Sequence, residues 1–262
     1  MIAGFVDVPT GARDMDNALF WSAHIRDTFL PQVRVLRETI LQRFMPTFQS
    51  MSDEAEQVTE DAWQELGQRA GADVDPGDLA EMARDAGVDR YLMLNSAKQG
   101  LLNLFAVAVH HLVEQQQLFL LRREPLPRND EFNHHLLNAT EFATRLMASG
   151  IDISLYPSAA KLRELRLVAN VVKHAEGPAL SQLRQVRPDM GLPEFMRSTD
   201  LGNRSTRSAL RFVYQPLAGE DVHVSEEDLA GYFDAAEEFW THLTSDLRRL
   251  HEALVASRLT RP

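Results

Sequence analysis

The residues best suited to acid–base chemistry lie in one segment, KLRELRLVANVVKHAEG, at residues 161–177. If this segment is a helix, with about 100° between successive residues, its apolar side chains gather on one face. They are Leu162, Leu165, Val168, Ala169 and Val172. The opposite face carries Arg163, Arg166, Asn170, Lys173 and His174. Arg166, Asn170 and His174 are successive i, i+4 neighbours, so one anionic ligand could contact all three.

This polar face has the groups that cleavage of RNA by its own 2′-hydroxyl requires. Histidine titrates near neutral pH as a residue type, so His174 is the candidate acid or base. Arg166 and Lys173 would stabilise the charge that develops on the phosphate, and Asn170 would orient it. A solvated basic face is the alternative interpretation, because charged residues usually cover the exposed side of a helix.

A second polar cluster, HHLVEQ at residues 110–115, contains His110, His111, Glu114 and Gln115. His110–Glu114 and His111–Gln115 are i, i+4 pairs. His111 and Glu114 are i, i+3 neighbours and can share a helix face. Three interpretations stay open: a buried, hydrogen-bonded His–Glu pair, a support in which Glu114 orients Arg166 or His174, and half of a di-iron site. No second carboxylate–histidine motif completes a di-iron site, so we expect neither a metal nor any other cofactor.

The sequence lacks the residues and motifs that several other kinds of catalytic or metal site require. The chain has no cysteine, which removes disulfides, thiolate catalysis and cysteine-based metal sites. It has no glycine-rich phosphate loop, no nucleophile elbow and no HExxH zinc helix. The aromatic residues fall mostly at the spacing of a hydrophobic core, so no platform for stacking nucleic-acid bases is expected.

The net charge of −11 over 262 residues argues against a general nucleic-acid coat protein. The charge is uneven, because residues 51–90 hold 12 acidic and 3 basic residues. Residues 161–211 hold 10 basic and 5 acidic residues instead. Two differently charged solvent faces explain this pattern, and an anion-binding surface beside an acidic one explains it equally.

Hydrophobic periodicity predicts helices along almost the whole chain. The first covers residues 17–45, with an interruption at Pro31, because proline lacks the amide proton and clashes with the preceding turn. A helix over 53–67 would begin at Ser52 as N-cap, and a short one would run from Asp75-Pro76 to Gly87. Residues 91–123 are apolar nearly all round, as is typical of a central helix enclosed by neighbours.

The second half of the chain predicts four more helices. One, capped by Asn129 or Asp130, ends at Gly150, and another runs over 157–174 until Gly177-Pro178. A short helix over 179–187 follows, and then a β-hairpin pairs residues 210–215 with 222–224. Ser225 and Asp228 form a capping box that opens the last helix.

This last helix carries an unbroken heptad seam, which buries itself against long neighbours or a second copy. Its members are Leu229, Phe233, Ala236, Trp240, Leu243, Leu247, Leu250 and Leu254. We therefore predict one all-α domain over residues 1–262, a bundle of long antiparallel helices with a short β-hairpin before the C-terminal helix. The acidic stretch 51–90 would be a peripheral helical insertion.

The run LRELRLVANVVKH resembles the signature of the HEPN superfamily of bacterial helical proteins. Asn170 and His174 match the Asn and His of that signature, and Ala169 occupies the position where the family has arginine. The resemblance covers residues 91–257. It implies a helical homodimer that acts as a metal-independent endoribonuclease in a toxin–antitoxin or phage-defence system, with RNA and an antitoxin as partners.

The alternative is a catalytically inactive helical interaction or scaffold protein. In that case the acidic residues 51–90 bind a basic protein partner and the seam from Leu229 to Leu254 forms the oligomer. Whether the chain is an enzyme stays open at this point. The start of the chain has no signal-peptide pattern, and no uninterrupted apolar run has the length of a membrane span. We therefore expect a cytoplasmic protein without a membrane partner.

Overall fold

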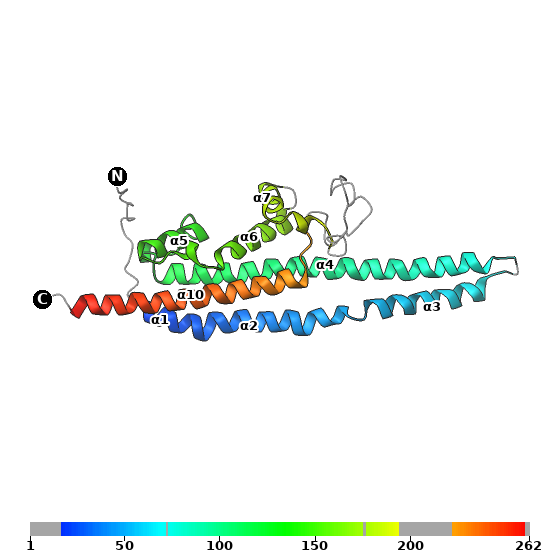
Figure 1. The fold of residues 1–262 in the computed structure, drawn as a ribbon, viewed down its shortest axis with the longest axis horizontal. Helices are drawn as coiled ribbons and strands as arrows, with labels where there is room; N and C mark the ends of the chain where they lie inside the picture. The colour runs from blue at the N-terminus through cyan, green and yellow to red at the C-terminus, as the bar shows by residue number, and fades with distance from the viewer. Residues whose placement is uncertain (1–16, 72, 175–176, 194–221, 260–262) are drawn as a thin grey trace. The chain divides into compact units, whose positions relative to one another are not determined.

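The computed structural model describes residues 17–71, 73–174, 177–193 and 222–259 (Figure 1). Helices make up most of these residues and no strand occurs among them, so the predicted all-α fold is confirmed. Residues 210–215 of the predicted hairpin lie outside the described part of the chain. Residues 222–224, its other half, are not in a strand.

Contacts along the chain divide it into two compact units. The first unit consists of residues 1–37, 108–166 and 230–262, and the second of residues 38–107 and 167–229. Four helices have residues in both units: α2 (Leu30–Glu38), of which only Glu38 is in the second unit, α4 (Pro76–Arg123), α6 (Ala159–His174) and α10 (Glu226–Leu259). The two units are described separately below.

The N-terminal helical segment changes its winding at the predicted interruption. Helix α1 (Ala18–His24) passes into a π-helical turn at Ile25–Phe29, and α2 (Leu30–Glu38) follows. Pro31 is the second residue of α2, directly after the wide π turn, where the missing amide proton is tolerated. A second π turn at Thr39–Phe44 and a 3-10 turn at Met45–Phe48 complete the segment.

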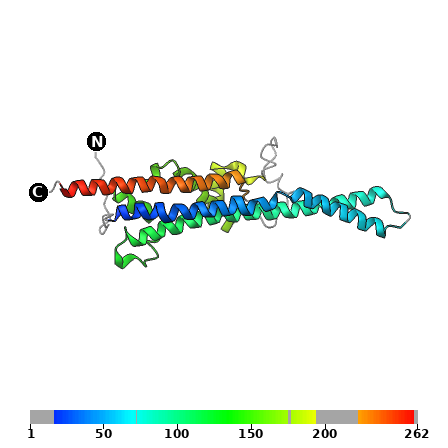
Figure 2. The same ribbon diagram turned by 90° about the horizontal axis from the view of Figure 1, so that it is seen from below.

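In the second unit, α3 (Met51–Arg69) runs antiparallel to the beginning of α4 (Figures 1 and 2). The prediction that a short helix ends at Gly87 is wrong, because α4 continues through this residue without a break. Gly87 serves close packing instead: a β-carbon there would overlap the Thr59 hydroxyl and lie 2.7 Å from the Ala55 carbonyl oxygen. The N-cap of α3 is Ser50, two residues before the predicted Ser52.

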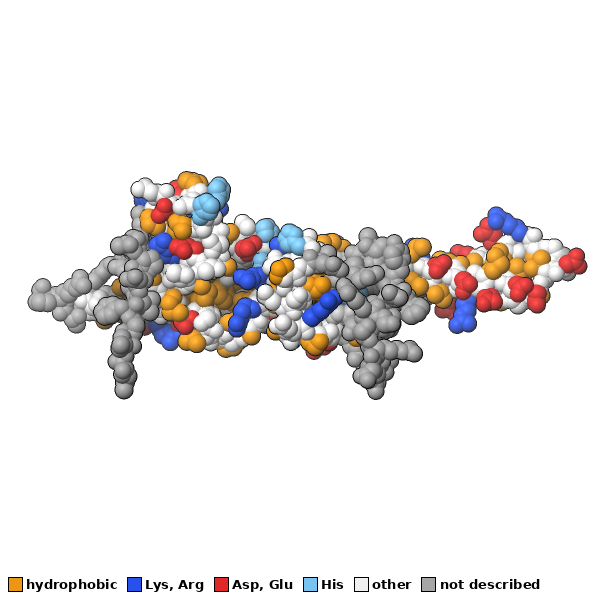
Figure 3. Space-filling view, turned by 90° about the horizontal axis from the view of Figure 1, so that it is seen from above, with side chains coloured by type: hydrophobic (Ala, Val, Ile, Leu, Met, Phe, Trp, Pro, Cys, Tyr) orange, Lys and Arg blue, Asp and Glu red, His pale blue; other side chains and the backbone are white. Residues whose placement is uncertain are grey.

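The α3–α4 hairpin carries the acidic residues 51–90 on its surface (Figure 3). Arg90 is paired with Glu54 at 2.9 Å, across the hairpin. Large hydrophobic side chains are exposed among the acids: Trp63, Val74, Met82, Val88, Tyr91, Leu92 and Met93. The hairpin surface is therefore both acidic and partly apolar.

In the first unit, α5 (Ala139–Ala148) begins later than predicted. Its N-cap is Asn138, whose side chain accepts a hydrogen bond of 2.9 Å from the amide of Glu141. Asn129 and Asp130, the predicted caps, belong to a separate 3-10 turn at Arg128–Asp130. Gly150 follows α5 with φ of 83°, a conformation that glycine adopts without strain. A second 3-10 turn at Ile153–Leu155 leads towards α6.

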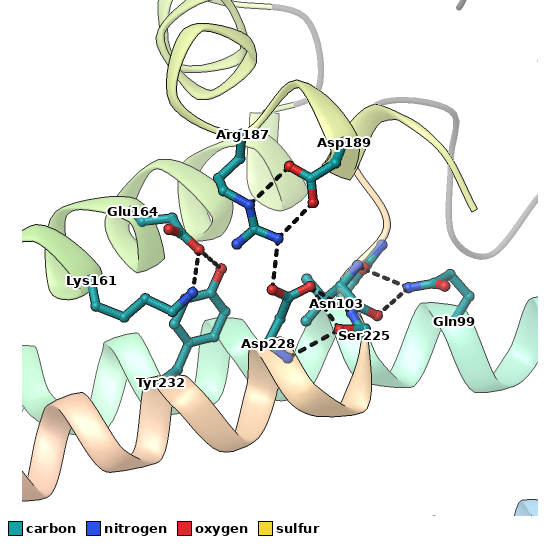
Figure 4. A network of polar contacts seen from close by, with 10 residues as sticks. Gln99, Asn103, Lys161, Glu164, Arg187, Asp189, Ser225, Asp228 and Tyr232 are labelled. Atoms are coloured by element: carbon teal, nitrogen blue, oxygen red, sulfur yellow. Dashed lines mark hydrogen bonds and ion pairs between the residues drawn. The ribbon is translucent and has the colours of Figure 1, made fainter. Parts of the chain in front are cut away.

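The second unit also contains α7 (Pro178–Val186) and a 3-10 turn at Pro188–Gly191. The capping box predicted at the start of α10 is confirmed (Figure 4). The amide of Asp228 donates to Ser225 Oγ at 3.0 Å, and Asp228 Oδ2 accepts from the Ser225 amide at 3.1 Å. Arg187 adds an ion pair of 2.8 Å to Asp228.

The heptad seam of α10 is buried within the single chain along most of its length. Six members have almost no exposed surface, from Leu229 to Leu247. Leu250 and Leu254 are partly exposed. The seam therefore serves intramolecular packing first, and only its last two residues retain free surface for an oligomer.

Helix α4 is the one described helix whose length and apolar composition would suffice to cross a membrane. Of the most apolar 18-residue stretch of α4, 33% is buried. The central helix of a soluble protein satisfies the same criterion, so this finding is weak evidence for a membrane span.

Candidate functional site: a cavity between α4, α5 and α6

The first unit encloses an open cavity of about 440 Å³. Its walls come from α4, the start of α5, the 3-10 turn at 153–155, α6 and α10. The apolar part of the wall includes Val113, Leu162, Leu165 and Phe239. Ligand pockets in proteins usually have volumes between about 300 and 1,000 Å³ and are lined mainly by apolar side chains. This cavity therefore has the size and lining of a small-molecule site.

Charged side chains at the cavity come from two helices. Glu114 extends from α4, and Arg163 and Arg166 extend from α6. Within the described part of the chain, neither Glu114 nor Arg166 has a hydrogen bond or an ion pair with another residue. Among the residues that the structure describes, the Arg163 guanidinium donates only to the Ala159 carbonyl in its own helix, at 3.4 Å. Two cations and one anion thus remain available to a ligand.

The N-terminal end of α5 adds to the positive side of the cavity. Asn138, Ala139 and Thr140 line the wall there. The first amides of a helix have no partner inside the helix, and the helix dipole places partial positive charge at this end. Asn138 caps one of these amides, that of Glu141. The remaining amides and the two arginines favour an anionic group.

The structure brings together some of the predicted site residues and separates others. Glu114 and Arg166 line the same cavity, but among the described residues no hydrogen bond or ion pair joins them, so Glu114 does not orient Arg166 through a direct contact. His111 and Gln115 are exposed and are not part of the cavity wall, where His110 lies instead. A buried His111–Glu114 pair is ruled out, because His111 is exposed and Glu114 is only half-buried.

The reason for this shift lies in the buried side of α4. Val109, Val113 and Leu120 have almost no exposed surface and define the side that packs inward. His110 and Glu114 follow Val109 and Val113 directly along the helix and border that buried side. The burial pattern of the apolar residues was the sequence signal that could have singled out His110.

The polar face predicted on α6 is accessible but is not gathered in the cavity. Lys173 and His174 are exposed, Asn170 is half-buried, and none of these three lines the cavity. They belong to the second unit, whereas Arg166 belongs to the first. Ala169 has no exposed surface, as the predicted apolar face requires. The side chain of an arginine at position 169 would therefore begin in the protein interior.

A polar network that the sequence analysis did not identify fixes α6 in the first unit (Figure 4). Glu164 Oε1 accepts from Lys161 Nζ at 2.8 Å and from the Tyr232 hydroxyl of α10 at 2.9 Å. The Lys161 ammonium also lies 4.9 Å from the centre of the Tyr232 ring. Because Tyr232 is buried, these contacts hold the cavity wall on α6 in place.

The described residues contain no group of three or more His, Asp or Glu side chains that could hold a metal ion. Comparison of the chain with known protein families, with characterised proteins and with solved structures gives no match.

Proposed function

We propose that this chain is a helical binding protein whose α4–α5–α6 cavity takes a small amphipathic anion. The apolar wall would hold the body of the ligand, and Arg166 would pair with its anionic group. The observation that carries the proposal is the unpaired Arg166 at the wall of a mainly apolar cavity. A charge-assisted hydrogen bond to arginine is about twice as strong as a neutral one and fixes the orientation of a carboxylate.

The charge of Glu114 should lower the affinity of the cavity for an anion. Its carboxylate lines the same cavity and repels an anion there, unless the ligand brings a hydrogen-bond donor. Removal of the Glu114 charge is therefore expected to strengthen the binding of a plain carboxylate, whereas removal of the Arg166 charge weakens it. Opposite responses from two residues of one cavity distinguish specific binding from general hydrophobic adsorption.

The test is calorimetric titration of the full chain with octanoate, and with octanol as the uncharged compound of equal chain length. Arg166→Gln should weaken octanoate binding roughly tenfold, equivalent to about 1.4 kcal/mol, and Glu114→Gln should strengthen it. Arg122→Gln is the matched control, because Arg122 is exposed on α4 away from the cavity. Equal effects of Arg166→Gln and Arg122→Gln would contradict the proposal.

A protein-binding function is the second candidate, and the α3–α4 hairpin favours it. Its exposed Met82, Leu92 and Met93 belong to a hairpin whose residues 51–90 hold 12 acidic and 3 basic residues, a combination that suits a basic amphipathic partner. A Met82→Ser/Met93→Ser variant should abolish the capture of such a partner and leave octanoate binding unchanged.

The ribonuclease that the HEPN resemblance implies is a third candidate, favoured by the exposure of Lys173 and His174. It predicts cleavage of single-stranded RNA that His174→Ala abolishes, with Lys173→Gln weakening cleavage. It also predicts a homodimer, with a sedimentation mass near twice 29.6 kDa. Unchanged cleavage in His174→Ala would remove this candidate.

A further inference from the structure

The first unit contains a second cavity, of about 400 Å³, that shares no wall residue with the α4–α5–α6 cavity. It lies between α1 and the C-terminal end of α4. We name it the aromatic cavity after Phe20, Trp21, His24 and Phe119, which line it together with Glu124. Asn17 and Arg123 complete the wall.

The rings of this cavity are arranged in a defined way. His24 lies between Phe20 and Phe119, with ring centres 5.9 and 5.8 Å away and planes inclined by only 16° and 21°. Trp21 meets Phe20, His24 and Phe119 edge to face, at 5.4, 5.4 and 6.0 Å. Two of these rings lie outside the core, since Phe20 is 60% exposed and Phe119 is 42% exposed.

Glu124 places a negative charge at the wall of this cavity. The residue is only 6% exposed. Its Oε1 accepts from the Asn17 amide at 2.9 Å, and its Oε2 accepts from Asn17 Nδ2 at 3.1 Å and from Trp21 Nε1 at 3.0 Å. All three donors are neutral, and within the described residues no cation is paired with this carboxylate. The aromatic cavity therefore has an uncompensated buried negative charge.

Arg123 shows that the rings of this cavity attract cations. Its guanidinium lies 5.3 Å from the centre of the Phe119 ring. The faces of aromatic rings carry partial negative charge, and a cation within about 6 Å of the ring centre is attracted to them. Arg123 itself is exposed, so it can be displaced from the ring without breaking an ion pair.

We propose that the aromatic cavity binds a quaternary ammonium group. Aromatic faces and one carboxylate stabilise a cation there, and a carboxylate offers about four lone-pair positions. Three of them are already occupied at Glu124. A primary ammonium would leave most of its three N–H donors without acceptors, and a metal ion would find too few oxygen ligands. A quaternary ammonium has no N–H donor, so it needs only the charge and the aromatic surface.

The test is calorimetric titration of the full chain with choline and tetramethylammonium. The control compound is 3,3-dimethyl-1-butanol, which has the shape of choline with carbon in place of the charged nitrogen. We expect a dissociation constant of about 1 mM for the two cations and no measurable binding of the alcohol. Equal binding of choline and the alcohol, or no heat with choline at roughly 50 mM, would overturn the proposal.

Variants assign the binding to this cavity. Phe119→Leu should weaken choline binding about tenfold, since Leu keeps the bulk and loses the π face. Arg123→Gln should strengthen it, because the competing cation is removed, whereas Arg122→Gln should have no effect. Glu124→Gln should abolish binding, with circular dichroism to check folding. If Phe119→Leu and Arg123→Gln both leave the affinity unchanged, the site is elsewhere and the proposal fails.

Co-sedimentation with lipid vesicles distinguishes two sources of the quaternary ammonium group, a lipid headgroup and a free compound. Vesicles of phosphatidylcholine should capture the chain, and free choline should release it, if the group belongs to a lipid headgroup. Choline binding in solution without capture by vesicles identifies a free compound. Either result is consistent with the proposed chemistry, and neither depends on the anion site at Arg166.

Discussion

Gly87 of α4 lies so close to Thr59 of α3 that a β-carbon at Gly87 would overlap the Thr59 hydroxyl oxygen. The Thr59 hydroxyl in turn donates to the Ala55 carbonyl at 3.1 Å, and this carbonyl would lie 2.7 Å from the same β-carbon. The overlap involves backbone as well as side chain, so a rotamer change alone cannot relieve it. Glycine at this position allows the two helices of the acidic hairpin to pack at short range.

Gly87→Ala should therefore destabilise the protein, although alanine is the better helix former. The propensity gain is about 1 kcal/mol, and we expect the overlap to outweigh it for a net loss of about 1–2 kcal/mol. Gly67→Ala in α3 is the matched control, because nothing lies within 4 Å of an added β-carbon there. Urea unfolding should show a loss for the first variant and a gain for the second. A gain for both would mean that α3 and α4 are not closely packed at Gly87.

Tyr156 should make the stability of the protein fall at high pH. Burial, and then the hydrogen bond of 2.6 Å from its hydroxyl to Asp246, raise the pKa of Tyr156 above its usual value. Tyrosine in the unfolded chain ionises at about pH 10. Above that pH its ionisation stabilises the unfolded state. Below that pH the contribution of Tyr156 is complete, and above it the free energy of unfolding decreases as the pH rises.

Tyr156→Phe is expected to lose about 1 kcal/mol at pH 8 through the missing hydrogen bond. Its stability should depend less on pH than that of the wild type between roughly pH 10 and 11. Tyr91→Phe serves as the control, since Tyr91 is exposed on α4. Parallel pH curves for wild type and Tyr156→Phe would argue against a buried neutral hydroxyl.

Asp228 should contribute to stability at neutral pH and lose this contribution in acid. Burial alone would raise the pKa of Asp228, but hydrogen bonds from Arg187 and Ser225 outweigh burial and lower it below the usual value. The stabilisation is therefore complete above the pKa of an unfolded aspartate, about 3.9, and disappears as the pH falls through the lower folded pKa.

Asp228→Ala should cost about 2–3 kcal/mol at pH 7, because it removes the capping box and the ion pair with Arg187. Glu227→Ala removes an exposed acid from the same first turn of α10 and should change stability by less than about 0.5 kcal/mol. Thermal unfolding measured between pH 3 and pH 7 would show the difference, and similar losses in the two variants would refute the assignment.

Asn103 is expected to hold the segment before α10 through its side-chain amide. Its Nδ2 donates to the Val222 carbonyl at 2.9 Å, and its Oδ1 accepts from the Val224 amide at 3.0 Å. Asn103→Leu would leave both backbone groups without this partner in a buried setting, at a cost of about 2–4 kcal/mol. Amide hydrogen exchange at Val224 should accelerate in this variant, whereas Asn129→Leu, at an exposed position, should leave it unchanged.

Local patterns in the sequence were sufficient for the helical fold and for several of its boundaries. The Ser225–Asp228 capping box, the end of α4 before Pro125 and the buried seam of α10 follow from interactions within a few residues along the chain. Such interactions depend on residue type and helical spacing, which the sequence states directly.

Only the tertiary structure decided what depends on distant residues. Gly87 was mistaken for a helix end because α3, which needs its small size, is not visible from the residues around it. His111 was chosen over His110 because the packed side of α4 is set by its neighbours. The hydrogen bond from Trp21 to Glu124 joins residues 103 positions apart, and both residues line the aromatic cavity. Helical periodicity fixes which residues share a face, but the packing of other helices decides which face is closed and which remains open to a ligand.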